Sequence, residues 1–447
     1  MHRVGAGGKL FLPQFVVYKN VYQNNKLNWR NQMKFNKWTL GLAAVGLVSW
    51  NSAAVAQDTA APATVLTSLS STTLSGYVDT SAQWNLGTGN ANTPFYTFGG
   101  PSKADGFNLN VVQLSLDKPL DESEWAAGYH VDLWLGPDAN TLGTASINSF
   151  GGGDFAIRQA YISLRTPVGN GLDWKIGVFD TVIGYESLAS VNNPNYTHSY
   201  GFTIEPTTHT GILGTYKVSD AVSISAGIAN TVGPTINEKA HGPNFSGSTV
   251  AESSKTYMGA VALTAPTSWG WIGGSTFSFG VVNGFNDGAA EFGGANQANV
   301  YAGLTMNTPV TALKLGASMD FVQVHDAKNV FANPNQDDID FTGDGTIWDG
   351  ALYATFQATE KLSFSARGEF LDDSADLVVD TSEFGKARAK IWSGTATAQY
   401  DLWKNVITRA EFRWDHGDNG KYFGGQFAGE PDRRNAFLLA AQVIYKF

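Results

Sequence analysis

The chain has 447 residues, a formal net charge of −10 and no cysteine. The lack of cysteine excludes disulfides, thiolate metal sites and thiol nucleophiles, and the acidic balance argues against a nucleic-acid partner, which would need a basic face. Glycine is abundant, at 50 residues, and no apolar run after residue 56 is long enough for a membrane helix. This excludes a helical membrane protein but leaves a membrane β-barrel, whose lipid face is spread over alternate residues.

The first readable element is a secretory signal peptide, predicted over residues 33–56. Lys34 and Lys37 form a short basic region, an apolar run of about 13 residues follows at 38–50, and Ala-Val-Ala at 54–56 is a small-residue cleavage site. The apolar run is too short for a spanning helix, which needs roughly 20 residues. The chain is therefore expected to be exported.

Three further segments follow from this prediction. Residues 1–32 are interpreted as the product of a start codon assigned too early, with an unusually long basic region of the signal peptide as the alternative. Residues 57–72, rich in Ala, Thr, Ser and Pro, are expected to form a flexible periplasmic tail. Residues 73–447 are expected to form the folded domain.

From residue 73 onward, apolar and polar side chains alternate in segments of about 9 to 13 residues. Such strict alternation indicates β-strands. One example sets Ala160, Ile162 and Leu164 against Gln159, Ser163 and Arg165. The final strand carries a similar apolar row, made of Leu439, Ala441, Val443, Tyr445 and Phe447.

The connections between these segments alternate in length. Short turns are expected at residues 119–122, 167–171, 219–220, 265–268, 308–310, 359–360 and 402–405. Long polar loops are expected near 87–106, 137–154, 181–206, 231–254, 286–296, 325–346, 373–388 and 417–434. Seven short and eight long connections join sixteen strands. We therefore predict an all-β fold, a transmembrane antiparallel barrel with short periplasmic turns and long outer loops.

In such a barrel the last strand closes on the first, near residues 74–84. Its apolar row then faces lipid acyl chains, with Tyr445 and Phe447 in the periplasmic aromatic girdle. Closure also satisfies every backbone polar group, which hydrocarbon requires.

Several stretches carry a family resemblance. They are GYVDTSAQWN, RQAYISLRTPVGNGLDWKIGVFD, NPNYTHSYGF and THTGILGTY. Together with the terminal Phe447, which is similar to the sorting signal read by the barrel-assembly machinery, they resemble the OmpL-like β-barrel porin family. This resemblance covers the chain from about residue 73 and implies an outer-membrane porin that contacts lipid. By analogy with porins of similar build, it also implies a homotrimer.

The barrel interior is expected to be mixed in charge. Its candidate residues are His130, Asp132, Asp173, Lys175, Lys314, Asp320, Arg367, Glu369, Arg409, Glu411, Arg413 and Asp415. One interpretation makes them neutralised wall residues that keep the lumen wet. The other makes Arg367, Arg409 and Arg413 the basic side of a field across a constriction, which selects permeants by charge.

The loop at 181–206 is the candidate for that constriction, because similar porins fold their third outer loop into the barrel. It carries Glu186 and Glu205 as its only acids, together with polar and aromatic side chains. These are Tyr185, Asn193, Asn195, Tyr196, His198 and Tyr200. They predict a pore that is weakly selective for cations or tolerant of neutral sugars. In the alternative, the loop packs on the wall and its aromatic residues are its own core.

A second candidate site lies in residues 332–350. Asp338, Asp340, Asp344 and Asp349 resemble the start of a calcium loop, in which oxygens at alternate positions surround the ion. Ala351 stands where a bidentate Glu belongs. A solvated acidic outer loop is the alternative interpretation.

Signatures of known enzymes are missing from the sequence, including G-x-S-x-G, H-E-x-x-H and a Walker loop. We therefore expect no enzyme and no cofactor beyond that calcium. The leading interpretation is passive diffusion of small hydrophilic solutes through a water-filled barrel in the bacterial outer membrane. The alternatives are an outer-membrane barrel enzyme and a non-conducting structural or adhesion barrel.

Overall fold

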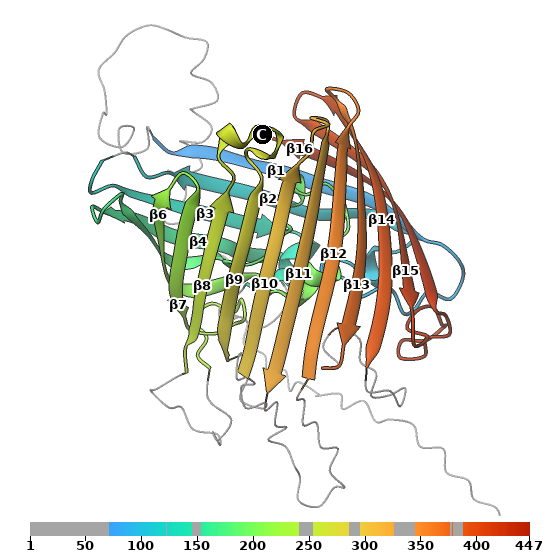
Figure 1. Cartoon of the computed structure of the whole chain (residues 1–447). Helices are drawn as coiled ribbons and strands as arrows, with labels where there is room; N and C mark the ends of the chain where they lie inside the picture. Colours follow the sequence, from blue (N-terminus) through green and yellow to red (C-terminus); the bar gives the residue numbers. More distant parts are fainter. Residues whose placement is uncertain are drawn as a thin grey trace, which may run out of the picture. The chain divides into compact units, whose positions relative to one another are not determined.

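The computed structural model describes residues 71–121, 123–144, 153–240, 254–285, 296–325, 345–375, 378 and 388–447. The predicted signal peptide and the segments 1–32 and 57–70 lie outside this part of the chain. Within the described residues, sixteen strands form one closed antiparallel barrel. Each strand pairs with its neighbours in the chain and β16 returns to β1 (Figure 1). The predicted fold class and strand number are therefore confirmed.

The strands are β1 (Thr73–Asn85), β2 (Gly106–Lys118), β3 (Ala127–Leu135), β4 (Phe155–Thr166), β5 (Leu172–Asp180), β6 (Thr208–Ser219), β7 (Val222–Ala229), β8 (Thr256–Thr264), β9 (Thr276–Phe285), β10 (Asn296–Asn307), β11 (Leu313–His325), β12 (Gly345–Gln357), β13 (Leu362–Asp373), β14 (Ala389–Trp403), β15 (Val406–Gly417) and β16 (Asn435–Lys446). Short helices lie between them, namely η1 (Pro101–Lys103), α3 (Pro137–Leu142), η2 (Ser190–Asn192), α4 (Tyr200–Ile204) and η3 (Thr267–Ile272). In the part of the chain described, no helix is long and apolar enough to cross a membrane.

The two rows of each strand face different surroundings, as β16 shows. Leu439 and Val443 point outward and are 41% and 47% exposed, whereas Gln442 points inward and is 2% exposed. An exposed apolar row beside a buried polar row is the reverse of a soluble sheet. It is the arrangement that a strand adopts between lipid and a filled interior.

Closure joins the two ends of the domain. Val78 pairs with Tyr445 and Ala82 with Ala441. Gly76 and Phe447 exchange two backbone hydrogen bonds, each 3.0 Å long. The end of the chain is therefore held by a full strand partner, as the alternation in residues 439–447 predicted.

Two of the short connections are four or more residues longer than expected. The β2–β3 connection runs over residues 119–126, and the β8–β9 connection over 265–275 includes η3. Pro266 precedes η3, and Asn307 Nδ2 donates a 2.7 Å hydrogen bond to the carbonyl of Gly273. A side chain of β10 thus stabilises the β8–β9 connection, which the sequence pattern predicted to be a tight turn.

The interior of the barrel is packed rather than uniformly hollow. One apolar cluster combines Tyr200 and Ile204 of α4 with Val322 of β11 and Ile347 of β12, all at most 7% exposed. A loop segment therefore lies inside the barrel and covers part of its wall.

Candidate functional site

The segment 181–207 joins β5 to β6. Ile183 near its start packs with Phe179, Leu213 and Val282 of β5, β6 and β9, and the rest of the segment lies against the inner wall formed by β10 to β16 and β1. It ends in α4, which begins at a Ser199 cap whose Oγ accepts a 3.0 Å hydrogen bond from the Phe202 amide. We call this segment the inner loop. Its position combines the two alternatives that the sequence left open, because it enters the barrel and packs on the wall.

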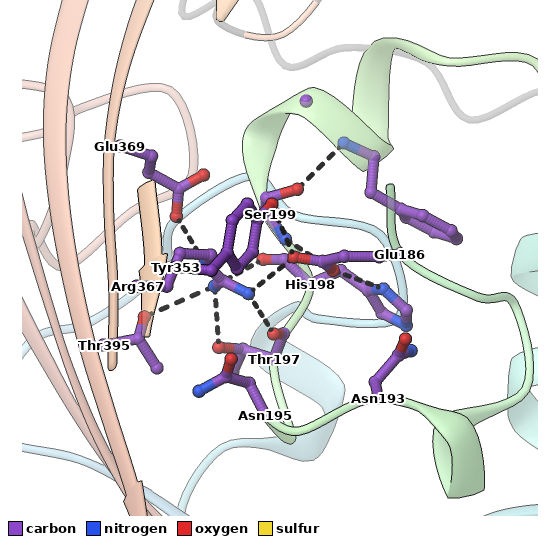
Figure 2. Close-up of polar contacts among 12 residues, drawn as sticks. Glu186, Asn193, Asn195, Thr197, His198, Ser199, Tyr353, Arg367, Glu369 and Thr395 are labelled. Carbon is purple, nitrogen blue, oxygen red and sulfur yellow. Dashed lines mark hydrogen bonds and ion pairs between the residues drawn. The ribbon is translucent and has the colours of Figure 1, made fainter. Parts of the chain in front are cut away.

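Arg367 of β13 is the principal anchor of the inner loop (Figure 2). Its Nη1 donates to Glu186 Oε1 at 2.9 Å and to the Thr197 carbonyl at 2.7 Å. Its Nη2 donates to the His198 carbonyl at 3.0 Å, and its Nε donates to Glu369 at 3.1 Å. One planar guanidinium thus joins Glu369 of its own strand to a carboxylate and two backbone carbonyls of the inner loop.

Glu186 is the counterpart of Arg367 on the inner loop. Besides Arg367, its carboxylate accepts hydrogen bonds from Tyr353 Oη at 3.2 Å and the Ser199 amide at 3.1 Å. His198 Nδ1 lies 3.0 Å from its Oε2. Burial alone would raise the pKa of Glu186, but the Arg367 charge and the hydrogen bond from His198 outweigh it and lower the pKa to about 2.

Strand β15, which β14 separates from β13, supplies three further charged contacts to the inner loop. Arg413 Nη1 donates to the His198 carbonyl at 2.6 Å. Arg409 Nη2 donates to the Asn193 carbonyl at 2.5 Å. Glu411 accepts hydrogen bonds from two loop amides, including that of Thr197 at 2.9 Å. Backbone groups of an irregular segment, which need partners when buried, thereby find them on the wall.

Aromatic side chains complete the contact. Tyr185 stacks on Tyr353 with ring centroids 4.2 Å apart, and its hydroxyl accepts a 3.3 Å hydrogen bond from Thr305. On the other side of the loop, Tyr200 Oη donates to Asp415 Oδ1 at 2.9 Å. These rings fill space between the loop and the wall.

Asn195 of the inner loop also faces the wall, because its Nδ2 donates to Thr397 Oγ1 at 2.6 Å. The candidate constriction residues of the loop and of strands β13 and β15 are thus brought together by the fold. They form one polar interface between the inner loop and the wall.

The structure differs from the predicted constriction in what these groups face. Arg367, Arg409 and Arg413 are 2%, 4% and 0% exposed. Each guanidinium donates to loop carbonyls; Arg367 and Arg413 also bind wall carboxylates, whereas Arg409 binds the side-chain amides of Gln399 and Gln442. These residues hold the inner loop against the wall, and Arg367 and Arg413 are paired with nearby carboxylates.

The first outer loop adds residues that the sequence did not single out. Tyr96 lies with its ring centroid 4.4 Å from the Arg413 guanidinium carbon, and Phe98 packs against His198 and Phe202. Asp79 of β1 accepts a 2.6 Å hydrogen bond from Ser190 of the inner loop. The alternation of β1 places Asp79 inward, but nothing in the sequence indicates its partner.

The opposite wall, β4 to β9, is lined mainly by small side chains. The inward row there includes Gly177, Gly211, Ser225, Gly227, Ala260, Ala262, Ser278 and Gly280. A cavity of about 400 Å³ lies along this wall. It is bordered by the start of the inner loop at Thr181 and Val182. We call this space the open half of the barrel.

Few charged groups line the open half. Lys175 lies there with its Nζ 4.7 Å from the centroid of the Tyr161 ring. Asp180 also lines the cavity, and Arg158 donates to it at 2.5 Å. His130 lies with Nδ1 2.8 Å from Asp117. A solute would therefore meet several hydroxyl groups, with Lys175 and Asp180 as the charged groups among them.

The calcium prediction stays a prediction. Asp338, Asp340 and Asp344 lie outside the described residues. Asp349 is 1% exposed on the inward row of β12, where its Oδ1 accepts a 3.0 Å hydrogen bond from the Gly201 amide. Among the residues described, no group of three or more His, Cys, Asp or Glu is placed to hold a metal ion.

Comparison with known proteins places this geometry in a family. Residues 71–447 match the model of the family described as "Putative beta-barrel porin-2, OmpL-like". No match was found among curated proteins.

Solved structures share the fold. The anion-selective porin from Comamonas acidovorans is 16% identical with a TM-score of 0.55, over 84% of this chain and 99% of that one. The outer-membrane channel DcaP of Acinetobacter baumannii is 12% identical with a TM-score of 0.53, over 84% and 97%. The trimer form of OmpT of Vibrio cholerae is 12% identical with a TM-score of 0.50, over 84% and 99%.

The family match covers the whole barrel, and the fold of these solved structures agrees with it. A sixteen-stranded barrel with an inner loop and a polar open half is the build of a channel rather than of an enzyme. The chain belongs to the OmpL-like β-barrel porin family and is a porin of the bacterial outer membrane.

Proposed function

We propose that small hydrophilic solutes diffuse passively through the open half of the barrel, along the inner wall of β4 to β9. The observation that supports this path is that the interior of the barrel is filled unequally. Long charged side chains of β12 to β15 are covered by the inner loop, whereas glycine, alanine and serine on β6 to β9 leave a cavity of about 400 Å³. A hydroxyl-lined passage replaces part of a solute's hydration without demanding a charge, so neutral sugars are expected to pass.

The natural lack of cysteine makes this path directly testable. Ser225→Cys places a thiol in the open half, and Ser393→Cys places one on β14, where Ser393 lies between Glu369 and Asp415 and is 5% exposed. In planar bilayers, a charged methanethiosulfonate reagent should reduce the current through Ser225→Cys and leave that through Ser393→Cys unchanged. The reverse pattern, or reaction at neither thiol in a conducting barrel, would contradict the proposed path.

Charge selectivity belongs to the same proposal. The acidic composition favours weak selectivity for cations at the mouths, but charge further away than about 10 Å is largely screened at 0.1 M salt. Reversal potentials in a KCl gradient measure the outcome. They should depend on groups that line the open half more than on the total charge of the chain.

We also propose that the porin assembles as a homotrimer. Support comes from the trimer form in which the structurally similar OmpT of Vibrio cholerae was solved. Light scattering of the detergent-solubilised protein, corrected for bound detergent, should give three chains per particle. A particle with one chain would overturn the assembly and leave the permeation path intact.

We keep calcium binding by the outer segment that contains Asp340 and Asp344 as a separate proposal, supported by the spacing of its carboxylates. Titration calorimetry with Ca²⁺ should show saturable binding that Asp344→Asn weakens. Heat signals identical in the two proteins would remove the proposal.

A further inference from the structure

Lys175 occupies an unusual place in the open half. On the inward row its cross-strand neighbours are Ser163 of β4 and Leu213 of β6, and neither carries a charge. Across the described parts of the chain, it forms no salt bridge. Its Nζ instead lies 4.7 Å from the centroid of the Tyr161 ring. A cation held over an aromatic face keeps its hydrogen-bond donors available to a ligand.

The Tyr161 ring is itself held in place by a second aromatic side chain. His130 stacks on it with ring centroids 5.4 Å apart and an interplanar angle of 22°. The imidazole is fixed at both nitrogens, with Nδ1 2.8 Å from Asp117 and Nε2 3.1 Å from Asp132. The stack of His130, Tyr161 and Lys175 thus positions the ammonium group at the wall of the cavity.

The carboxylates near this stack contact basic side chains other than Lys175, and Asp180 also lines the cavity. Arg158 bridges Asp132 and Asp180. Asp173, two residues from Lys175, binds Arg165 through contacts of 2.6 and 2.8 Å. Within the described residues Lys175 has no ion-pair partner within 4 Å, so its ammonium group is available to a ligand, beside the Asp180 carboxylate that lines the same cavity.

Hydroxyl groups face the same cavity. Thr215 and Ser225 contact each other at 2.9 Å and line it together with Ser223 and Ser278. A lysine with several hydroxyls in a cavity of about 400 Å³ is suited to a small carboxylate that also carries hydroxyl groups. The ammonium binds the anionic end, and the hydroxyls bind the rest.

We propose that Lys175, with Thr215 and Ser225, forms an anion-binding site in the open half, which admits small hydroxylated carboxylates more readily than neutral solutes of the same size. This inference rests on the proposed permeation path. One unit charge about 6 Å from a passing ion in water changes the local concentration of that ion roughly threefold. Lys175 is accordingly inferred to be a specificity-determining residue.

The test compares Lys175→Gln with Lys217→Gln. Lys217 lies on the inward row of β6, but it is 64% exposed and already paired with Asp220 at 2.8 Å, so its loss should change little. The readouts are the reversal potential in a KCl gradient at 0.1 M and the liposome-swelling rates for gluconate and glucose. Lys175→Gln should lower the gluconate-to-glucose ratio roughly threefold, and the chloride-to-potassium permeability ratio by up to roughly ninefold, because the same charge attracts chloride and repels potassium. The chloride effect should shrink at 1 M salt.

Two further variants test the stack. Tyr161→Phe keeps the aromatic face and should keep both ratios, whereas Tyr161→Leu removes it and should lower them part of the way. If Lys175→Gln fails to assemble, Lys175→Met retains the aliphatic stem and replaces it in both assays.

The outcomes separate the two proposals. A wild-type barrel that conducts nothing would overturn the permeation path, and this site with it. A conducting barrel whose two ratios are unchanged by Lys175→Gln or Lys175→Met would overturn the anion site alone.

Discussion

Replacing Glu186 by Gln isolates the charge that holds the inner loop. The amide keeps the shape of the side chain but offers no negative charge to Arg367, 2.9 Å away. The pKa of Glu186 falls from 4.5 to about 2 in the folded protein. For this buried group, that difference corresponds to about 3 kcal/mol of stabilisation. Its loss should raise the fraction of time that the loop spends away from the wall roughly a hundredfold.

Single-channel recording in planar bilayers at pH 7 measures this change directly. Glu186→Gln should show frequent transitions to a state of higher conductance. Each time the loop leaves β13, it stops narrowing the passage. Glu360→Gln is the matched control, since Glu360 is exposed in the turn between β12 and β13. It should be as quiet as the wild type.

The same pair of proteins gives a pH test with a defined sign. A carboxylate whose folded pKa is lowered contributes its full stabilisation above pH 4.5 and loses it as the pH falls through about 2. Wild-type current should therefore become noisier between pH 4.5 and 2, whereas Glu186→Gln should be noisy at pH 7 and show no such change. A variant as quiet as the wild type at pH 7 would refute the role assigned to the ion pair.

Three other changes test the barrel and its packing. Leu439→Arg puts a charge on the lipid face and should cost about 2–4 kcal/mol, seen as a lower urea midpoint in vesicles; an unchanged midpoint would show that the residue does not face lipid. Gly316→Ala would place a methyl group 1.8 Å from Tyr185 Oη and should lower the melting temperature, whereas Gly350→Ala, whose nearest neighbour is 3.6 Å away, should not. Phe447→Ala should reduce the heat-modifiable, folded fraction in outer membranes if the assembly machinery reads the terminal aromatic; an equal folded fraction would argue that it does not.

Most of the barrel could be predicted from the chain because the relevant signals are local. Alternation along residues 439–447 already identifies the outward row, and the contrast between turns and long loops gives the strand number. The predicted strand boundaries are less exact where a connection is hydrogen-bonded to a side chain of another strand, as the Gly273 carbonyl is to Asn307. Local patterns carry no information about such a contact.

The inner-loop interface could be predicted only in part. Glu186, His198 and Arg367 were recognisable as candidates because polar residues cluster in one loop and on one strand row. Their mutual pairing was not, since Glu186 and Arg367 are 181 residues apart and any inward cation could have served. Whether a guanidinium faces solute or loop depends on which wall the loop meets, and that is decided by packing over the whole barrel.

The two hydrogen bonds between Gly76 and Phe447 also constrain the order in which the barrel can assemble. The first strand must wait for the last, because its second partner leaves the ribosome 371 residues later. Until then the growing sheet has two edge strands with unpaired backbone groups, which could pair with other chains. A chain that lacks the closing strand would keep both sheet edges unpaired. Such a truncated chain should aggregate or be degraded rather than persist as a smaller pore.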